Sequence, residues 1–568
     1  MRTPYPALHS ARTPAWIIAI AMILLLPSAF ASTPADQLLV GMNMNNVLTL
    51  DPASATGNDV VPIAANLYDT LVELDPSEVT KITPAVADRW TISPDRRRIT
   101  FFLHQGIVFQ SGRALTADDV AWSLQRTVIL NRALASPWKS YGFSAKNVGE
   151  LIRAVDANTL TIDLPIVLDP KMILYTLGTS IGAVVLDKDA VMAHAQATGQ
   201  ADKQVNGQAN KQIDTLANKP ATDLGAAWLT THAAGSGPFT LAVWRAEDVM
   251  LLDRNPHYWR GPATMRRWVF RHIPEAQALR LMLERNDLDV AIGLSAPDIQ
   301  ALRRQAGVQV KSVSTGSVYY VALSMKAPHF ADKRVREAIR SLIDYAGINR
   351  SVMPNYGVPH QRPVQSGLAG SLPDPGYILN VAHAKTLLAD AGYPHGFETT
   401  IRVLSDPPYL NIATSLQSTL QLAGISAQVL TGTGNQIYGA MRDRKFDIVV
   451  GRGGGGLEPD PYSNLRALVY NPNNADAAKL TNFQGWRTGF FDPEINRLFV
   501  LAQQSPDSHE QAMLYQQAQR RYADDVGPIF PISQVTSTVV IGKDVHDYQL
   551  SPVWTTRVRD VSKQASRN

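Results

Sequence analysis

The sequence contains no cysteine among its 568 residues. This absence excludes disulfide bonds, thiolate metal sites, a cysteine nucleophile and a lipid anchor attached to a cysteine. Its histidines never come at the close spacing of metal ligands, such as H-x-x-x-H, so no resident metal or other cofactor is expected. Charged residues make up 18% of the chain and the formal net charge is only +4, so composition gives no indication of a nucleic-acid partner.

Long apolar runs are also rare, and the one that stands out lies at the N-terminus. Arg2 and Arg12 precede the run Trp16–Leu26, and Ala29–Ala31 supplies the small residues that a signal peptidase requires. The run is shorter than the ~20 residues that span a bilayer. We therefore expect a signal peptide over residues 1–31, cleaved after its last residue, and a mature protein in the periplasm. An uncleaved membrane anchor is the alternative.

The patterning of the chain changes along its length, which is about twice that of a single domain. From Trp90 to Leu164 the pattern is typical of β-strands with one helix, which Thr116 and Asp119 begin as a capping box. From Pro274 onward, helical and strand patterns alternate. Such alternation predicts βαβ units and a largely parallel sheet. The expected fold class is therefore α/β, with a break between domains at Pro274.

The segment from Lys445 to Leu465 is where we expect a ligand to bind. Phe446–Val450 is rich in β-branched residues and predicts a buried strand, which leads directly into Gly451–Gly456. Glycines allow the backbone to approach another molecule closely. Leu457–Tyr462 then predicts a rigid acidic turn, because its prolines disfavour the start of a helix. A strand that ends in bare backbone beside carboxylates suits the wall of a binding cleft.

Two motifs match enzyme signatures in their letters alone. The glycines at 451, 453 and 456 fit a dinucleotide fingerprint, but that fingerprint requires a helix directly afterwards, where prolines stand here. Ser180 lies in a Gly-x-Ser-x-Gly pattern, but a strand-like run follows it instead of the helix of a nucleophile elbow. Glu458 and Asp460 are an acid pair without a visible nucleophile. The protein is therefore not expected to be an enzyme, and a secreted hydrolase is the less favoured alternative.

Six short motifs occur in order along the chain. They are PAVADRWTISPD (84–95), GRALTADDV (112–120), GSGPF (235–239), RNPHYW (254–259), VREAI (335–339) and DPY (460–462). Together they resemble the motifs of the family-5 extracellular solute-binding proteins of ABC importers, the dipeptide- and oligopeptide-binding group. The similarity extends over residues from about 38 to 541, nearly the whole mature chain.

The resemblance implies a two-lobed periplasmic binding protein fold of the cluster C type with an additional β-rich subdomain. Residues 32–274 would form lobe I, with the subdomain at about 76–175. Residues 275–526 would form lobe II, and residues 527–568 would return to lobe I and end in a tail. Two crossings, near 272–274 and 525–531, would form the hinge. A ligand that contacts both lobes would stabilise the closed form.

The function that the resemblance implies is capture of a peptide or peptide-like solute and its delivery to an inner-membrane ABC permease with its ATPase subunits. The protein is expected to be a monomer. The candidate ligand contacts are Asn46, Leu50, Tyr319, Tyr320, Arg452, Gly453, Gly454, Gly455, Gly456, Leu457, Glu458, Asp460 and Trp486.

Leu457 is the position at which this chain departs from the peptide-binding members. In those members an aspartate before the DPD motif pairs with the α-ammonium group of the ligand. An apolar side chain at that place disfavours a cationic ligand end. The ligand can therefore be a blocked, cyclic or modified peptide. The alternative ligands are a non-peptide solute and a metal chelate of the siderophore, nickel or haem type.

Overall fold

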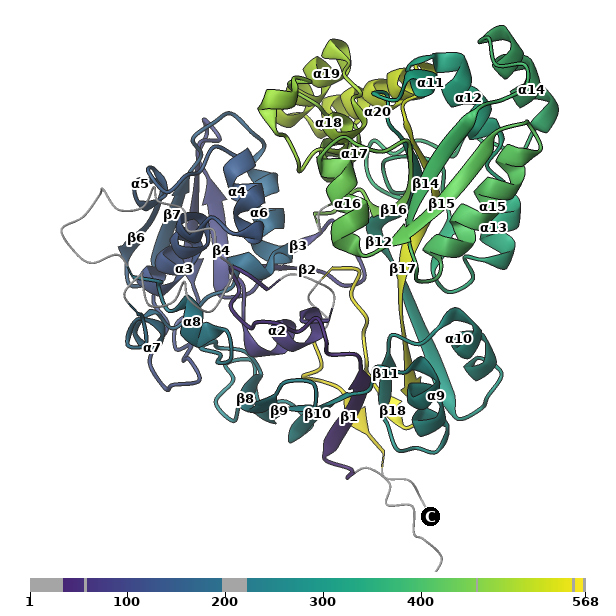
Figure 1. Ribbon diagram of the computed structural model, residues 1–568. Helices are drawn as coiled ribbons and strands as arrows, with labels where there is room; N and C mark the ends of the chain where they lie inside the picture. Colours follow the sequence, from purple (N-terminus) through teal and green to yellow (C-terminus); the bar gives the residue numbers. More distant parts are fainter. Residues whose placement is uncertain (1–33, 56–58, 197–221, 456–457, 554–556, 565–568) are drawn as a thin grey trace, which may run out of the picture.

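The computed structural model describes residues 34–55, 59–196, 222–455, 458–553 and 557–564. The predicted signal peptide, Gly456 and Leu457 lie outside these ranges. Within them, no helix is both long and apolar enough to cross a membrane. Figure 1 shows three bodies: a lower body, a β-rich subdomain at the upper left and an α/β body at the upper right. We refer to the lower body with the subdomain as lobe I, and to the α/β body as lobe II.

The lower body holds one end of the main sheet. Its strands are β1 (Gln37–Met42), β8 (Phe239–Arg245), β9 (Val249–Arg254), β10 (Arg267–His272) and β11 (Val290–Ile292), with the small pairs β2 (Val72–Leu74) with β3 (Ile82–Pro84) and β18 (Val545–His546) with β19 (Ser562–Lys563). Its helices are α2 (Val61–Leu67), α7 (Lys188–Met192), α8 (Ala226–Leu229), α9 (Ala276–Glu284) and α10 (Ala296–Leu302).

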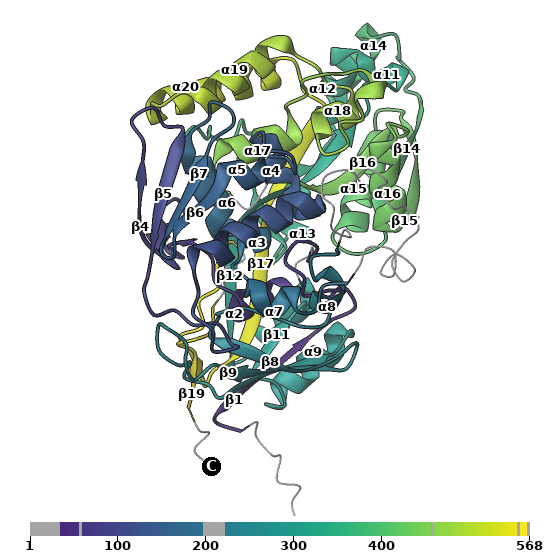
Figure 2. The same ribbon diagram turned by 90° about the vertical axis from the view of Figure 1, so that its left-hand side faces the viewer.

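The subdomain is a four-stranded antiparallel sheet covered by helices on one face (Figures 1 and 2). Its strands are β4 (Ala87–Ile92), β5 (Arg98–Leu103), β6 (Ile152–Asp156) and β7 (Thr159–Asp163). Its helices are α3 (Ala117–Leu130), α4 (Ser136–Ser140), α5 (Val148–Leu151) and α6 (Pro170–Thr179), with short 3-10 turns η1 (Ala133–Ala135) and η2 (Ile181–Ala183). The expected strands and the capped helix α3 are confirmed, but the expectation of a single helix between residues 90 and 164 is wrong, because α4 and α5 also lie there.

Lobe II is the part in which helices and strands alternate. Its strands are β12 (Val308–Leu323), β13 (Gly357–Pro359), β14 (Glu398–Leu404), β15 (Ser426–Gly432), β16 (Ile448–Gly453) and β17 (Ile529–Gly542). Its helices are α11 (Pro328–Ala331), α12 (Lys333–Ser341), α13 (Tyr345–Ser351), α14 (Val381–Asp390), α15 (Tyr409–Gln421), α16 (Gly434–Arg442), α17 (Pro461–Leu468), η4 (Asp476–Ala478), α18 (Gln484–Thr488), α19 (Pro493–Gln504) and α20 (Ser508–Asp524).

One mixed sheet runs through both lobes, in the order β15-β14-β16-β12-β17-β11-β1-β10-β9-β8. Pairing is parallel among β14, β15 and β16, and between β1 and its neighbours β10 and β11. The long strands β12 and β17 pair antiparallel with each other and with their other neighbours. The expectation of a largely parallel sheet is therefore right only for parts of it.

The passage between the lobes lies on β12 and β17, not at the predicted crossings near 272–274 and 525–531. Residues 276–302 pack on the lower body, where β11 pairs with β1 and β17, and Leu279, Leu283 and Leu302 share a buried cluster with Val540. Pro274 only separates β10 from α9. The predicted lobe boundary at 274/275 is wrong, because the apolar faces of α9 and α10 are buried against the sheet of lobe I. The ladder between β12 and β17 is itself interrupted between Ser314 and Val318.

Several helices begin at a residue whose side chain caps the first turn. The Asp332 carboxylate accepts a hydrogen bond from the backbone of Arg334 at the start of α12, and Thr116 with Asp119 forms the predicted capping box of α3. The Asp460 carboxylate likewise accepts from the backbone N–H of Tyr462, and Pro461 occupies the first position of α17. The expectation that no helix begins here is wrong, because a proline at that position removes an N–H that has no partner inside the helix.

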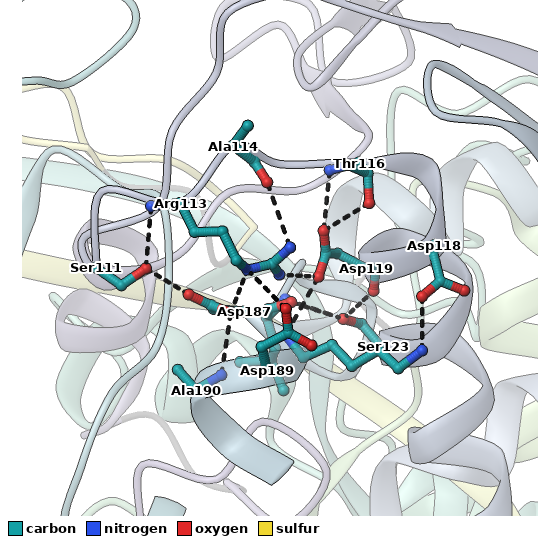
Figure 3. A network of polar contacts seen from close by, with 12 residues as sticks. Ser111, Arg113, Ala114, Thr116, Asp118, Asp119, Ser123, Asp187, Asp189 and Ala190 are labelled. Carbon is teal, nitrogen blue, oxygen red and sulfur yellow. Dashed lines mark hydrogen bonds and ion pairs between the residues drawn. The ribbon is translucent and has the colours of Figure 1, made fainter. Parts of the chain in front are cut away.

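The subdomain is tied to the lower body through Arg113 (Figure 3). Its guanidinium forms ion pairs with Asp119 at the start of α3 and with Asp187, whose Oδ1 lies 2.9 Å from Nε. Ser111 donates to the other oxygen of Asp187 over 2.5 Å. The motif at residues 112–120 thus forms a closed network inside lobe I, which gives it a structural role.

Candidate functional site

Apart from the connecting strands, the two lobes touch where the start of α6 of the subdomain meets α17, α19 and α20 of lobe II. Lys171 Nζ lies 3.2 Å from Asp460 Oδ2. Asp169 donates its backbone N–H to the carbonyl of Gln503 over 3.0 Å and accepts from Gln511 Nε2, also over 3.0 Å. The lobes are therefore joined in two places, by β12 with β17 and by these contacts.

Asp460 is the central group of this contact. Burial raises the pKa of its carboxyl group, and the charge of Lys171 and the hydrogen bond from the Tyr462 backbone oppose that rise. Next to it, the rings of Tyr141 in the subdomain and Tyr462 in lobe II lie 6.3 Å apart. Both tyrosines belong to one buried apolar cluster that contains residues of both lobes. The contact thus combines an ion pair with apolar packing.

A cavity of about 680 Å³ lies beside this contact, between residues 131–140 of the subdomain and residues 462–503 of lobe II. Its walls carry the aromatic side chains Tyr462, Tyr470, Phe483 and Phe499. Phe499 stacks on Tyr470 and Tyr462, with centroid distances of 4.3 Å and 5.0 Å. The volume lies within the range of about 300–1,000 Å³ that is typical of small-molecule sites.

Local structure explains how these walls are placed. Asn131 ends α3 in the left-handed conformation and turns the chain toward α4. Lys479 adopts the same conformation after η4, which turns residues 480–483 toward the cavity. On α17, Tyr462 and Arg466 are four residues apart and so share one face of the helix. The capping of α17 by Asp460 therefore sets the direction in which both side chains point.

The cavity also carries positive charge. Arg132, Lys139, Arg466 and Lys479 line it. The guanidinium carbon of Arg466 lies 4.9 Å from the centre of the Phe483 ring. Burial raises the pKa of Tyr462, and the charge of Arg466 is the largest influence against that rise.

The candidate contacts Leu50, Tyr319, Tyr320 and Trp486 are core residues. Each is at most 4% exposed. Leu50 accepts a hydrogen bond at its carbonyl from Tyr68, and Trp486 donates its indole N–H to the carbonyl of Ala475. These four are therefore placed by packing inside a lobe. Asn46 is exposed and donates to Asp59 over 3.1 Å.

The glycine segment is also more tightly packed than expected. Gly451 and Gly453 continue β16 and pair with Tyr320 and Val318 of β12. A Cβ at Gly451 would lie 2.9 Å from the Tyr320 hydroxyl, and one at Gly455 would lie 2.5 Å from the carbonyl oxygen of Gly316. The expectation of a bare, unpaired backbone is therefore wrong for Gly451–Gly453. The glycines make room for neighbours within lobe II.

Arg452 and Glu458 keep a position from which they could meet a ligand. Arg452 follows the carboxyl end of the parallel strands, the edge at which open α/β sheets bind ligands. Its backbone N–H donates to the Tyr438 hydroxyl over 3.3 Å, and its charge opposes the rise that burial causes in the pKa of Tyr319 and Tyr409. Glu458 accepts from the Ser463 hydroxyl over 2.9 Å.

Sequence reasoning missed the cavity itself, since none of the described candidate residues lines it. The available signal was the position of Arg466 one helical turn after Tyr462, which becomes visible once Asp460 is recognised as a helix cap. Ser180 is buried at the end of α6, and its hydroxyl accepts from the Gly182 N–H. In the described part of the chain, no group of three or more His, Asp or Glu side chains is placed to hold a metal ion.

Two lobes joined by a pair of strands, with a partly open cavity between them, are the arrangement of the two-lobed binding proteins. A match to a family model assigns the chain to one family within this class. Residues 81–476 match the model of the bacterial extracellular solute-binding proteins, family 5 Middle, and the chain belongs to this family.

Relatives cover nearly the whole chain. The probable D,D-dipeptide-binding periplasmic protein DdpA of Escherichia coli (strain K12) is 25% identical over 94% of this chain and 96% of its own. Heme-binding protein A of Haemophilus influenzae is 24% identical over 86% of this chain and 85% of its own. The fold matches that of the periplasmic binding protein DppA from Helicobacter pylori in complex with the peptide STSA, with a TM-score of 0.73, 22% identity, and coverage of 93% of this chain and 98% of that one.

Proposed function

We propose that this protein is the periplasmic solute-binding component of an ABC importer, and that it captures a peptide or peptide-like solute between its two lobes. The observation that carries the proposal is the cavity lined by both the subdomain and lobe II. Relatives named for dipeptides and tripeptides, and the peptide-bound DppA structure, support the ligand class. The leader at residues 1–31 would direct the chain to the periplasm, where it would meet an inner-membrane permease.

The geometry supports a specific closing motion. Bending at the interrupted ladder between Ser314 and Val318 would move lobe II relative to lobe I. Closure would form the Lys171–Asp460 ion pair and the Tyr141–Tyr462 contact, which join opposite sides of the gap. A solute that touches both walls binds only the closed form fully, so it shifts the population toward that form.

The proposed contacts come from both walls of the gap. Tyr462, Arg466 and Phe483 would cover the solute from lobe II, and Ser136 with Lys139 from the subdomain. Arg452, near the end of β16, and Glu458, beyond that end, are proposed as a second part of the lobe II wall.

Calorimetry and small-angle X-ray scattering of the purified mature protein test this function. Pools of dipeptides, tripeptides and tetrapeptides should include one that binds and reduces the radius of gyration, without any hydrolysis of the peptide. A parallel titration with haem tests the chelate alternative. Folded protein that binds none of the peptide pools, or that binds haem alone, would overturn the proposal.

A further inference from the structure

The four cations of the inter-lobe cavity have no acidic counterpart in its walls. Arg132, Lys139, Arg466 and Lys479 line the cavity, and no aspartate or glutamate is among the described residues that do so. Arg132, Lys139 and Lys479 are exposed at its edge, whereas Arg466 is half-buried. A concave site lined by one sign of charge concentrates ligands of the opposite sign.

Arg466 is the member of this set that lacks a polar partner. Among the residues that the structure describes, none forms a hydrogen bond or an ion pair with its guanidinium, and its close contact is the face of Phe483 at 4.9 Å. Neither of the carboxylates just before α17 lines the cavity: Glu458 accepts from the Ser463 hydroxyl, and Asp460 pairs with Lys171. A guanidinium held against an aromatic ring keeps its donors free for a planar anion.

The other cations of the cavity are only weakly neutralised. Lys139 Nζ donates to the neutral side chain of Asn131 over 3.0 Å. Arg132 donates to the Ser54 hydroxyl over 2.6 Å and lies 3.9 Å from Asp51, which already pairs with Arg126 at 2.6 Å. The positive charge around the cavity is therefore available to a ligand.

From these contacts we infer that the solute is anionic and places a carboxylate on Arg466, with its apolar part against Tyr462, Tyr470 and Phe483. This inference rests on the proposed function and narrows its ligand to acidic peptides or peptide-like acids. The carboxylate can come from an acidic side chain or from the C-terminus of the peptide. A basic peptide would bring a fifth cation into a site that already holds four, so it should be rejected.

Competition binding with matched tripeptide pools tests the inference. The pools carry Glu, Gln or Lys at one position and are made with a free and with an amidated C-terminus. We expect the Glu pool to bind at least about tenfold tighter than the Lys pool, which corresponds to about 1.4 kcal/mol. If that preference survives amidation, the carboxylate on Arg466 is that of the side chain; if amidation abolishes binding of every pool, it is the terminal one.

Variants link the preference to Arg466. R466Q should abolish the discrimination between carboxylate and amide, and R466K should restore part of it. R497Q is the control, because Arg497 is exposed on α19 and pairs with Glu494 outside the cavity. Equal binding of the Glu and Lys pools, or an unchanged preference in R466Q, would overturn the inference and leave the proposed function standing. Failure of every pool to bind would overturn both.

Discussion

Arginine side chains have carboxylate partners in one region of this protein and lack them in another. In lobe I, Arg557 lies 2.8 Å from Asp69 and 2.7 Å from Glu73, and Arg113 lies between Asp119 and Asp187. In the inter-lobe cavity, Arg466 faces no carboxylate of the described chain. A half-buried guanidinium without a carboxylate partner in the described chain keeps its hydrogen-bond donors available to an anionic solute. The paired arginines therefore stabilise lobe I, whereas Arg466 is available to bind a solute.

The largest effect should follow loss of Asp69. Its carboxylate is fully buried and accepts hydrogen bonds from Ser236, Tyr258, Trp259 and Arg557. D69A leaves a buried arginine with one of its partners removed, so we expect a loss of about 3–5 kcal/mol in the free energy of unfolding. Urea denaturation measures it. The control D560A removes an exposed carboxylate that pairs with Arg559 and should change little. Similar losses of unfolding free energy in D69A and D560A would show that the buried ion pairs do not stabilise lobe I.

A matched pair of substitutions sharpens the contrast between the regions. R113M leaves two buried carboxylates without their cation and should cost about 2 kcal/mol of unfolding free energy in ligand-free protein. R466M removes a cation without a carboxylate partner and should change that energy by no more than about 0.5 kcal/mol. Urea denaturation of both variants measures these two changes in the free energy of unfolding. A loss in R466M as large as that in R113M would mean that Arg466 serves the fold.

The closing contact should affect binding more than folding. K171M removes the cation that faces Asp460 across the gap, so the closed form loses an ion pair and affinity for a bound solute should fall by about tenfold. K188M is the control, because Lys188 pairs with Asp118 inside lobe I. Calorimetry with the tightest peptide pool measures both. Equal affinities for K171M and wild type would show that this contact does not contribute to closure.

The smallest effect should be seen in the response to acid. Burial by itself would raise the pKa of Asp69, but the charge and hydrogen bond of Arg557 and the hydrogen bond of Ser236 bring it below the usual 3.8. A lowered pKa means that its contribution is complete above pH 3.8 and is lost as the pH falls below that value toward the folded-state pKa. Acid unfolding followed by circular dichroism should therefore be less steep below that pH in D69N. Identical acid slopes would contradict this role.

Sequence reasoning found the fold class and most elements of lobe II because they depend on local signals. Asp332 before an amphipathic stretch, and Gly392 and Gly424 after the helices α14 and α15, mark helix ends without any knowledge of the tertiary structure. The lobe boundary was misplaced because α9 and α10 look the same in sequence whichever sheet they cover. Their assignment to lobe I depends on strand pairings between residues that are far apart in the chain.

The site could be predicted only in part for the same reason. The turn at Asp460 was predicted to lie at the binding cleft, and its role as the cap of α17 is a local signal that was not recognised. Its ion pair with Lys171 could not be predicted, because it joins residues almost 300 positions apart. The cavity joins residues 131–140 to residues 462–503, and no local pattern reports that two such segments face each other. Tyr320 was expected at the ligand, but its ring lies in the core, where Gly451 makes room for it, and this close approach follows from the pairing of β12 with β16.

Native mass spectrometry of the protein isolated from its own cells is the most direct test of an anionic ligand on Arg466, because it measures the mass of the solute that remains bound. We expect a bound peptide-like compound of net negative charge that is absent from the R466Q variant isolated in the same way. A bound cationic solute, or an anionic one retained equally by R466Q, would contradict it.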